Sequence, residues 1–213
     1  MSTPEKNKYA SWAYAEEHSG QDSLLERARQ LSADVGTKPI SDGTAAALTT
    51  LAAACGARNI VGIGLGAGLA GAALMRGAAA DAVLTGIDAD VDSVGATRQL
   101  LRSIGVPSSR TRLISGKATE VLPRLTPRGY DLVFIDAEGE AAAEYVQHGL
   151  RLLHAGGTLI LNDALDADRV PKPAVREAST QAMRHVEATL RDDDAVVTAL
   201  LSTGTGLLVA VKR

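Results

Sequence analysis

The sequence predicts an α/β fold, a doubly wound and mostly parallel sheet with helices on both faces. Strand and helix patterns alternate from residue 59 onward, as in right-handed βαβ units. A glycine-rich turn, Gly64-Leu-Gly-Ala-Gly68, follows the first strand. The last two strands are separated by too few residues for a crossover helix, so they must pair as an antiparallel hairpin. With 213 residues, the chain is expected to form a single domain, 1–213.

Residues 1–56 are expected to form a helical extension to the α/β core, which spans 57–213. Within this extension, apolar side chains recur at helical spacing over 21–35 and again over 41–55.

The first twenty residues are polar but carry three aromatic side chains, Tyr9, Trp12 and Tyr14. Their spacing would not place all three on one narrow stripe of a short helix. This segment either docks the N-terminus onto the body of the protein or forms a flap over a substrate site.

The core elements follow from short apolar runs and from helical periodicity. Strands are predicted at 60–63, 82–87, 111–114, 130–136, 158–161, 195–201 and 206–211. Helices are predicted at 69–74, 91–104, 118–125, 140–153 and 173–190, the fourth of them ending at Gly156-Gly157.

Composition excludes several classes of protein. A net charge of −3 argues against a general binder of nucleic acid or membrane surfaces, so neither partner is expected. Polar residues interrupt every apolar run before it reaches transmembrane length, and the N-terminus lacks the apolar core of a signal peptide. The single cysteine, Cys55, cannot form an internal disulfide. A cytoplasmic protein is expected.

The glycine turn and Asp88 together predict an adenosine-containing ligand. Glycine permits positive φ and close approach of the backbone to a ligand, and the helix start behind the turn offers free N–H groups. Asp88 ends the second strand, 24 residues after Gly64, where a carboxylate can accept hydrogen bonds from both ribose hydroxyls. Capping the next helix is the alternative role for Asp88, although Asp90 or Asp92 could equally supply that cap.

Two classes of cofactor fit the turn. The segment Gly66-Ala-Gly-Leu-Ala-Gly71 matches the G-x-G-x-x-G pattern of dinucleotide sites. The alternating glycines from Gly64 to Gly68 fit the turn that approaches S-adenosylmethionine (SAM), which has no pyrophosphate. A dehydrogenase would need further strands or a substrate domain for which this chain has no room. We therefore expect SAM, with a nicotinamide dinucleotide as a distant alternative.

Five segments carry a specific resemblance. They are Gly64-Leu-Gly-Ala-Gly68, Thr85-Gly-Ile-Asp-Ala89, Leu113-Ile-Ser-Gly-Lys-Ala118, Tyr130-Asp-Leu-Val-Phe-Ile-Asp-Ala137 and Leu152-Leu-His-Ala-Gly-Gly157. In these segments the chain resembles the class I SAM-dependent O-methyltransferases, and most closely the bacterial branch of the catechol/caffeoyl-CoA O-methyltransferase-like family. The resemblance implies a seven-stranded Rossmann-like sheet with the order 3-2-1-4-5-7-6 and an antiparallel strand 7. It also implies a homodimer.

The resemblance implies a set of cofactor contacts at the strand ends. The set is Ile40, Gly62, Gly64, Leu65, Gly66, Gly68, Ala70, Asp88, Ala89, Lys117, Ala118, Asp136 and Glu138. Gly64 and Leu65 would give backbone N–H groups to the methionine carboxylate, and Asp88 would hold the ribose. Ile40 would lie at the methionine end. Lys117 and Ala118 would form the loop at the adenine edge.

Two positions depart from the family pattern. Where the family has an acidic residue that binds the methionine ammonium group, this chain has Gly62. The chain therefore lacks a charge-assisted contact of about 1.5–3 kcal/mol at this position. Glu138 is the nearest replacement. The family also has a lysine, a candidate general base, three positions after the aspartate that corresponds to Asp136. This chain has Gly139 at that position.

A divalent cation such as Mg²⁺ is the second possible cofactor. The family binds it through an aspartate after strand four and an Asp-Asn pair after strand five. This chain has Asp136, but the pair reads Asn162-Asp163, and a swap on a strand end redirects the carboxylate. A metal site formed by Asp136, Asn162 and Asp163, and simple capping of the loop by Asn162 and Asp163, remain alternatives.

The predicted function is SAM-dependent methyl transfer to a hydroxyl of a small, aromatic acceptor, with Asp136 as the candidate catalytic residue. The alternative is a catalytically weakened SAM-binding protein with a regulatory or scaffolding role, suggested by the losses at Gly62 and Gly139. The charged residues Asp166, Asp168 and Arg169, in the loop after the fifth strand, could face the substrate, but they are expected to face solvent.

Overall fold

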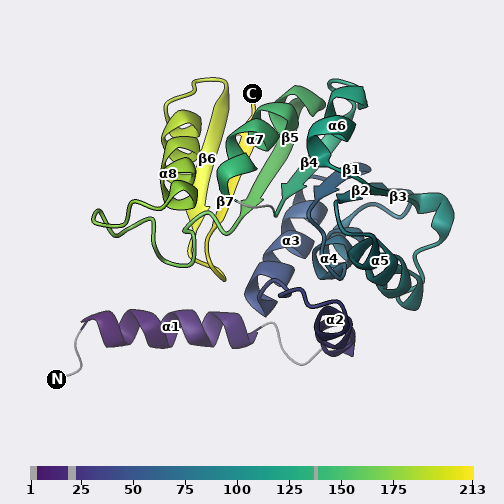
Figure 1. Ribbon diagram of the computed structural model, residues 1–213, viewed down its shortest axis with the longest axis horizontal. Helices are drawn as coiled ribbons and strands as arrows, with labels where there is room; N and C mark the ends of the chain where they lie inside the picture. The colour runs from purple at the N-terminus through teal and green to yellow at the C-terminus, as the bar shows by residue number, and fades with distance from the viewer. Residues whose placement is uncertain (1–3, 19–22, 137–138) are drawn as a thin grey trace.

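The chain folds into one seven-stranded sheet with helices on both faces. This computed structural model describes residues 4–18, 23–136 and 139–213. The strands are β1 (Asn59–Ile63), β2 (Val83–Asp88), β3 (Thr111–Ser115), β4 (Tyr130–Ile135), β5 (Leu153–Asn162), β6 (Val196–Leu201) and β7 (Leu207–Lys212). Their order is β3-β2-β1-β4-β5-β7-β6 (Figure 1). Strand β7 is antiparallel to both neighbours, which confirms the expected topology.

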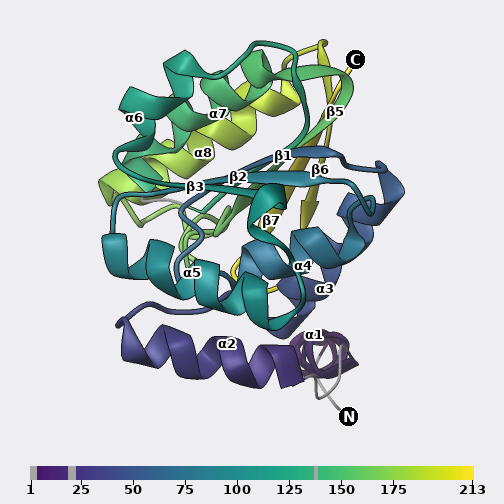
Figure 2. The same ribbon diagram turned by 90° about the vertical axis from the view of Figure 1, so that its right-hand side faces the viewer.

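The helices form a layer on each face of the sheet. Those described are α1 (Pro4–His18), α2 (Ser23–Asp34), α3 (Asp42–Ala54), α4 (Leu69–Gly77), α5 (Val91–Ser103), α6 (Ala118–Val121), α7 (Ala142–Leu152) and α8 (Ala178–Arg191). Figure 2 shows α6, α7 and α8 on one face and α3, α4 and α5 on the other. Each layer covers an apolar core, which includes Leu74 and Leu84 on the α4 side and Leu152 and Leu159 on the α7 side.

The N-terminal aromatic segment is a helix, α1, which runs across the ends of the strands and packs on α3 (Figure 1). The rings of Tyr9 and Trp12 are neighbours, with centroids 5.6 Å apart. Tyr9 and Tyr14 are 69% and 73% exposed, so α1 buries little of its aromatic surface. Among the described helices, none combines the length and the apolar character that a membrane span requires.

Strand β5 begins at Leu153, before its predicted start at residue 158. The glycines Gly156 and Gly157 lie inside the strand and do not end the preceding helix, which stops at Leu152. The register between β4 and β5 shifts near Tyr130, so the added residues form an irregularity in the ladder. A φ of 84° at Gly156 lets the strand bend there.

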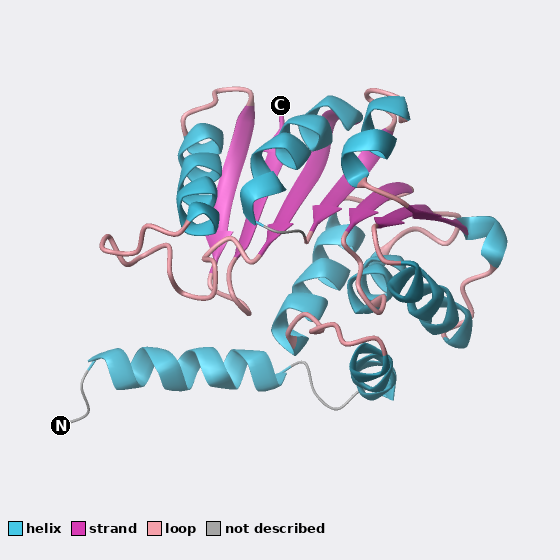
Figure 3. Cartoon of the chain, in the orientation of Figure 1, coloured by secondary structure: helices cyan, strands magenta, loops and turns pink. Residues whose placement is uncertain are grey.

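Helix α8 begins at Ala178, later than the predicted residue 173, and a long loop over 163–177 precedes it (Figure 3). Three consecutive residues from Asp166 onward have positive φ, at 49°, 48° and 62°, which a right-handed helix does not allow. Asp166 is buried and accepts hydrogen bonds from the hydroxyls of Ser179, at 3.1 Å, and Thr180, both in the first turn of α8. The expectation that Asp166 faces solvent is therefore wrong, because its carboxylate fixes the start of α8.

The sheet order reverses between β1 and β4, and in open α/β sheets ligands bind outside the carboxyl ends of the strands at such a switch point. The backbone N–H of Asp136 donates to the carbonyl oxygen of Ile63 at 2.9 Å. The segments that leave β1 and β4 therefore start side by side, and the fold positions a site above them.

Candidate functional site

The glycine turn joins β1 to α4 in a left-handed conformation. Gly64, Gly66 and Gly68 have φ values of 70°, 52° and 95°. Gly68 is the residue that precedes α4, and a Cβ atom there would lie 2.7 Å from the Cα of Thr97 in α5. At Gly68 both the positive φ and the close approach of α5 therefore require glycine.

Asp88 holds this turn in place. Its Oδ2 accepts a hydrogen bond from the backbone N–H of Gly66 at 3.0 Å, and its Oδ1 accepts one from the N–H of Asp90 at 3.1 Å. The cap of α5 is Asp90, whose carboxylate accepts from the N–H groups of Asp92 and Ser93. Asp88 is therefore not used as the cap of α5, and each of its oxygens keeps a second lone pair for a ligand.

The segment after β3 lies beside Asp88. The N–H of Gly116 donates to the carbonyl oxygen of Asp88 at 2.9 Å. Lys117 is exposed and precedes α6, whereas Ala118 is buried at the start of that helix. Ala89 is exposed next to Asp88. The residues expected at the adenine edge thus share one edge of the sheet with the expected ribose ligand.

A cavity of 310 Å³ lies at the ends of β4 and β5. The loop before α3, including Ile40, and the turn between β6 and β7 both contribute to its lining. Asp136, Asn162, Asp163 and Ala167 line it from the ends of β4 and β5 and the loop after β5.

Asp136 is half-buried, and the pKa of its carboxyl group is raised. Burial raises its pKa to about 6. The Nδ2 of Asn162, which donates to Oδ1 of Asp136 at 3.0 Å, lowers the pKa, whereas the carboxylates of Asp163 and Asp88 raise it. A carboxyl group with such a pKa is ionised in a large fraction of molecules near neutral pH and can accept a proton.

The three expected metal ligands line one cavity, but two of them are engaged by other protein groups. Asp163 has a φ of 53°, and its Oδ1 accepts a hydrogen bond from the N–H of Ala167 at 3.0 Å, so this carboxylate caps the following loop. Asn162 turns its amide N–H towards Asp136. Among the residues that the structure describes, there is no cluster of three or more His, Cys, Asp or Glu side chains that could hold a metal ion. Asn162 and Asp163 are thus held by protein contacts, and a Mg²⁺ site at these three residues stays a prediction.

Comparison with known proteins agrees with this geometry. The family model described as O-methyltransferase matches residues 14–213.

The chain belongs to this O-methyltransferase family.

A relative from Mycobacterium tuberculosis, named as a probable O-methyltransferase, is 38% identical over 201 residues, which cover 94% of this chain and 90% of the relative. A crystal structure of a Corynebacterium glutamicum protein superposes with a TM-score of 0.87 at 30% identity and covers 98% of this chain and 97% of that chain. The O-methyltransferase TomG from Streptomyces achromogenes, solved in complex with SAM, has the same fold with a TM-score of 0.82 at 24% identity, covering 91% of each chain. The resemblance to O-methyltransferases is confirmed.

In this O-methyltransferase an apolar side chain occupies the space beside Gly62, where the family has an acidic residue. A Cβ atom at Gly62 would lie 2.6 Å from Cδ2 of Leu65. A Cβ atom at Gly86, the partner of Gly62 in the register of β1 and β2, would lie 2.7 Å from Cδ1 of the same leucine. The buried Leu65 side chain thus packs over both glycines, and Gly62 offers no side-chain contact to a cofactor.

Two further expected contacts change their character in this O-methyltransferase. The N–H of Gly64 donates to the carbonyl oxygen of Ile87 at 2.9 Å, so it is not available to a methionine carboxylate in this structure. Gly64 therefore contributes by turning the chain. Ala70 is buried in α4 and adds to the apolar core. Glu138 lies outside the described residues.

The loop before α3 carries a polar group that the sequence did not single out. The Oγ1 of Thr37 is buried, and among the described residues it has no hydrogen-bond partner. It lies next to the glycine turn, because a Cβ atom at Gly66 would be 3.7 Å from it. A buried hydroxyl without a partner needs one, and a polar ligand on the turn of this O-methyltransferase would supply it. The turn, Asp88 and Thr37 therefore fit a polar cofactor such as SAM.

Proposed function

We propose that this protein transfers a methyl group from SAM to a hydroxyl of a small, aromatic acceptor bound in the cavity over Asp136. Bound SAM supplies an electrophilic methyl group on a sulfonium. The glycine turn and Asp88 would hold the adenosyl portion after β1 and β2, and the cavity after β4 and β5 would hold the acceptor. Two ligands in adjacent sites need only correct alignment for direct displacement, and positioning alone supplies much of the rate.

The observation that carries the proposal is the half-buried Asp136 carboxylate in the wall of the cavity, whose pKa is raised. An acceptor hydroxyl becomes a better nucleophile when a nearby group takes its proton. Asp136 has a pKa of about 6, so it is mostly ionised at neutral pH and able to accept that proton. Asn162 would keep the carboxylate oriented through the 3.0 Å hydrogen bond. In this proposal Asp136 is the general base, in place of the lysine that is Gly139 here.

Methyl transfer is tested with isotope-labelled SAM and a panel of catechols and caffeate, in buffer with Mg²⁺ and in buffer with EDTA. Asp136→Asn should lower kcat at least about 100-fold, the typical contribution of a general base, with a much smaller change in SAM affinity in calorimetry. Asp192→Asn, an exposed change of the same kind, serves as the control. Transfer by Asp136→Asn at the rate of the natural protein would refute the role of Asp136. Activity that depends strictly on Mg²⁺ would show that a metal site forms on binding.

The packing of Leu65 over Gly62 also favours a second candidate, a SAM-binding protein with weakened catalysis and a regulatory or scaffolding role. The predicted contact to the methionine ammonium is absent at this position. SAM binding by calorimetry without transfer to any acceptor would favour this candidate. Binding of a nicotinamide dinucleotide in place of SAM would contradict both.

We also propose a homodimer. Exposed apolar side chains on α1 and at the end of β6, such as Tyr9 and Leu200, support an association surface there. Light scattering of the purified protein would give its mass, and a monomer at all concentrations would refute the dimer.

A further inference from the structure

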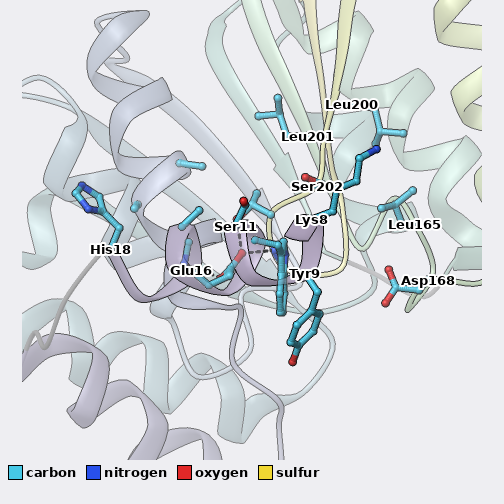
Figure 4. A pocket seen from close by; sticks show the side chains of 17 residues that line it. Lys8, Tyr9, Ser11, Glu16, His18, Leu165, Asp168, Leu200, Leu201 and Ser202 are labelled. Carbon is cyan, nitrogen blue, oxygen red and sulfur yellow. Dashed lines mark hydrogen bonds between the residues drawn. The ribbon is translucent and has the colours of Figure 1, made fainter. Parts of the chain in front are cut away.

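Glu16 joins three segments that are far apart in the sequence. Its Oε1 accepts hydrogen bonds from the backbone N–H of Gly204, at 2.6 Å, and from the hydroxyl of Thr203, at 2.8 Å. Its Oε2 accepts one from the backbone N–H of Gly43, at 3.0 Å. Helix α1 is thereby bonded to the start of α3 and to the turn between β6 and β7. Figure 4 shows Glu16 on α1, with dashed lines for hydrogen bonds among the residues around it.

The chemistry of these contacts makes them strong. Hydrogen bonds to an ionised carboxylate are shorter and roughly twice as strong as those between neutral groups. Gly43 belongs to the first turn of α3, whose N–H groups have no partner within the helix and lie at the positive end of its dipole. Burial raises the pKa of Glu16, but the hydrogen bonds from Gly204, Ser41, Thr203 and Gly43 outweigh it and hold the pKa below its usual value.

The segments that Glu16 joins form one wall of the acceptor cavity. Ser41 and Thr44 line the cavity from the start of α3, and Gly204 and Thr205 line it from the β6–β7 turn. The two sides touch, because a Cβ atom at Gly204 would lie 2.6 Å from Oγ1 of Thr44 and 2.9 Å from Oγ of Ser41. Glu16 bonds both sides, so its carboxylate sets how they meet.

The same turn is bonded to the chain that leaves β5. The N–H of Leu165 donates to the carbonyl oxygen of Thr205, and the N–H of Ala164 to that of Gly206, both at 3.0 Å. A displacement of the turn would therefore be transmitted to the segment that follows Asn162, the partner of Asp136.

From these contacts we infer that Glu16 is a positioning residue for the acceptor: its carboxylate holds the β6–β7 turn against the start of α3 and thereby fixes the cavity wall that faces Asp136. The inference rests on the proposed methyl transfer, since the cavity is the acceptor site in that proposal. Glu16 does not act on the reacting atoms.

The sequence provides a spectroscopic probe of this contact. Trp12 is the only tryptophan among the 213 residues. It lies one helical turn before Glu16 on α1, where it lines a surface groove together with Leu165 and Gly204. Its emission therefore reports whether α1 is packed against the β6–β7 turn.

The test compares Glu16→Ala and Glu16→Gln with Glu17→Gln, which removes the same charge from an exposed neighbour on α1. For Glu16→Ala we expect a red-shifted Trp12 emission and a KM for catechol raised about tenfold, equivalent to about 1.4 kcal/mol of lost binding. The SAM dissociation constant should change less than about twofold. Glu16→Gln keeps an acceptor oxygen and should lie between the two, and Glu17→Gln should match the natural protein.

An unchanged KM in Glu16→Ala would overturn the inference, and so would equal losses of catechol and SAM affinity, because they would indicate general unfolding. If the natural protein transfers no methyl group to any acceptor, the proposed function has failed, and calorimetry with catechol decides the positioning role alone. Weaker catechol binding by Glu16→Ala than by Glu17→Gln would then support it. Equal binding by the two variants, or no binding by either, would overturn it.

Discussion

Replacing Gly62 by alanine tests whether Leu65 occupies the position of the missing acid. The new Cβ would lie 2.6 Å from Cδ2 of Leu65 and 3.2 Å from its Cγ. Leu65 cannot turn aside without cost, because a Cβ at Gly86 would already be 2.7 Å from its Cδ1 and one at Gly71 would be 3.4 Å away. The leucine is thus closely packed on three sides.

Overpacking of this kind costs about 1–3 kcal/mol, and the smaller conformational freedom of alanine in the unfolded chain returns about 0.4–1 kcal/mol. We expect Gly62→Ala to lower the free energy of unfolding by about 1–2 kcal/mol. For a chain of 213 residues, each kcal/mol lowers Tm by about 2–4 °C.

Urea unfolding followed by circular dichroism measures this change. Gly95→Ala is the matched control, since it lies in α5 with no atom within 4 Å of the added Cβ, and it should be neutral or stabilising. In a Leu65→Ala background the effect of Gly62→Ala should shrink, because the two changes share one contact. If Gly62→Ala were as stable as Gly95→Ala, or if its effect were the same in both backgrounds, the packing argument would be refuted.

Two further predictions concern carboxylates away from the acceptor cavity. The hydrogen bond between His154 and Asp131, 2.8 Å long, raises the pKa of His154; burial raises the pKa of Asp131, but its bonds to His154, Asn59 and Arg58 outweigh this and lower it. The stability that protonated His154 contributes is therefore complete below the usual histidine pKa and is lost as pH rises through the raised value. His154→Gln should lower the free energy of unfolding most near pH 5 and least near pH 9, by less than about 1 kcal/mol. Thermal unfolding across this pH range measures the change. Asp166→Asn should lower the free energy of unfolding in urea by about 2 kcal/mol, because the buried group that accepts from Thr180 loses its charge. Asp168→Asn, at an exposed position, should not lower it. Equal stability of the two variants would contradict a structural role for the Asp166 carboxylate.

The fold could be predicted because its signals are local. Each βαβ unit carries its own apolar periodicity, and the short connection over 202–205 permits only a hairpin. The start of β5 was missed because a glycine pair usually ends a helix, and only the pairing with β4 shows that the chain continues as a strand. The start of α8 was missed for a similar reason, since its first turn is bonded through the hydroxyls of Ser179 and Thr180 to Asp166 in the preceding loop.

The site was partly predictable for the same physical reason. Gly66 follows β1 and Asp88 ends the next strand, β2, only 22 residues later, so a sequence motif places both at one site. Glu16 and Gly204 are 188 residues apart, and no pattern in the sequence connects them. The unpartnered hydroxyl of Thr37 likewise becomes visible only when the fold places it beside Gly66.

The cofactor site and the acceptor cavity are built from different parts of the chain. The expected cofactor contacts on β1, β2 and β3 come from one continuous stretch, 59–118, whereas the wall fixed by Glu16 is assembled from both ends of the polypeptide. Substitutions near the termini could therefore broaden or narrow the range of accepted hydroxyl compounds while methyl-donor recognition stays intact. Related enzymes could thus change their acceptor through substitutions near the two termini while the cofactor-binding segment stays the same.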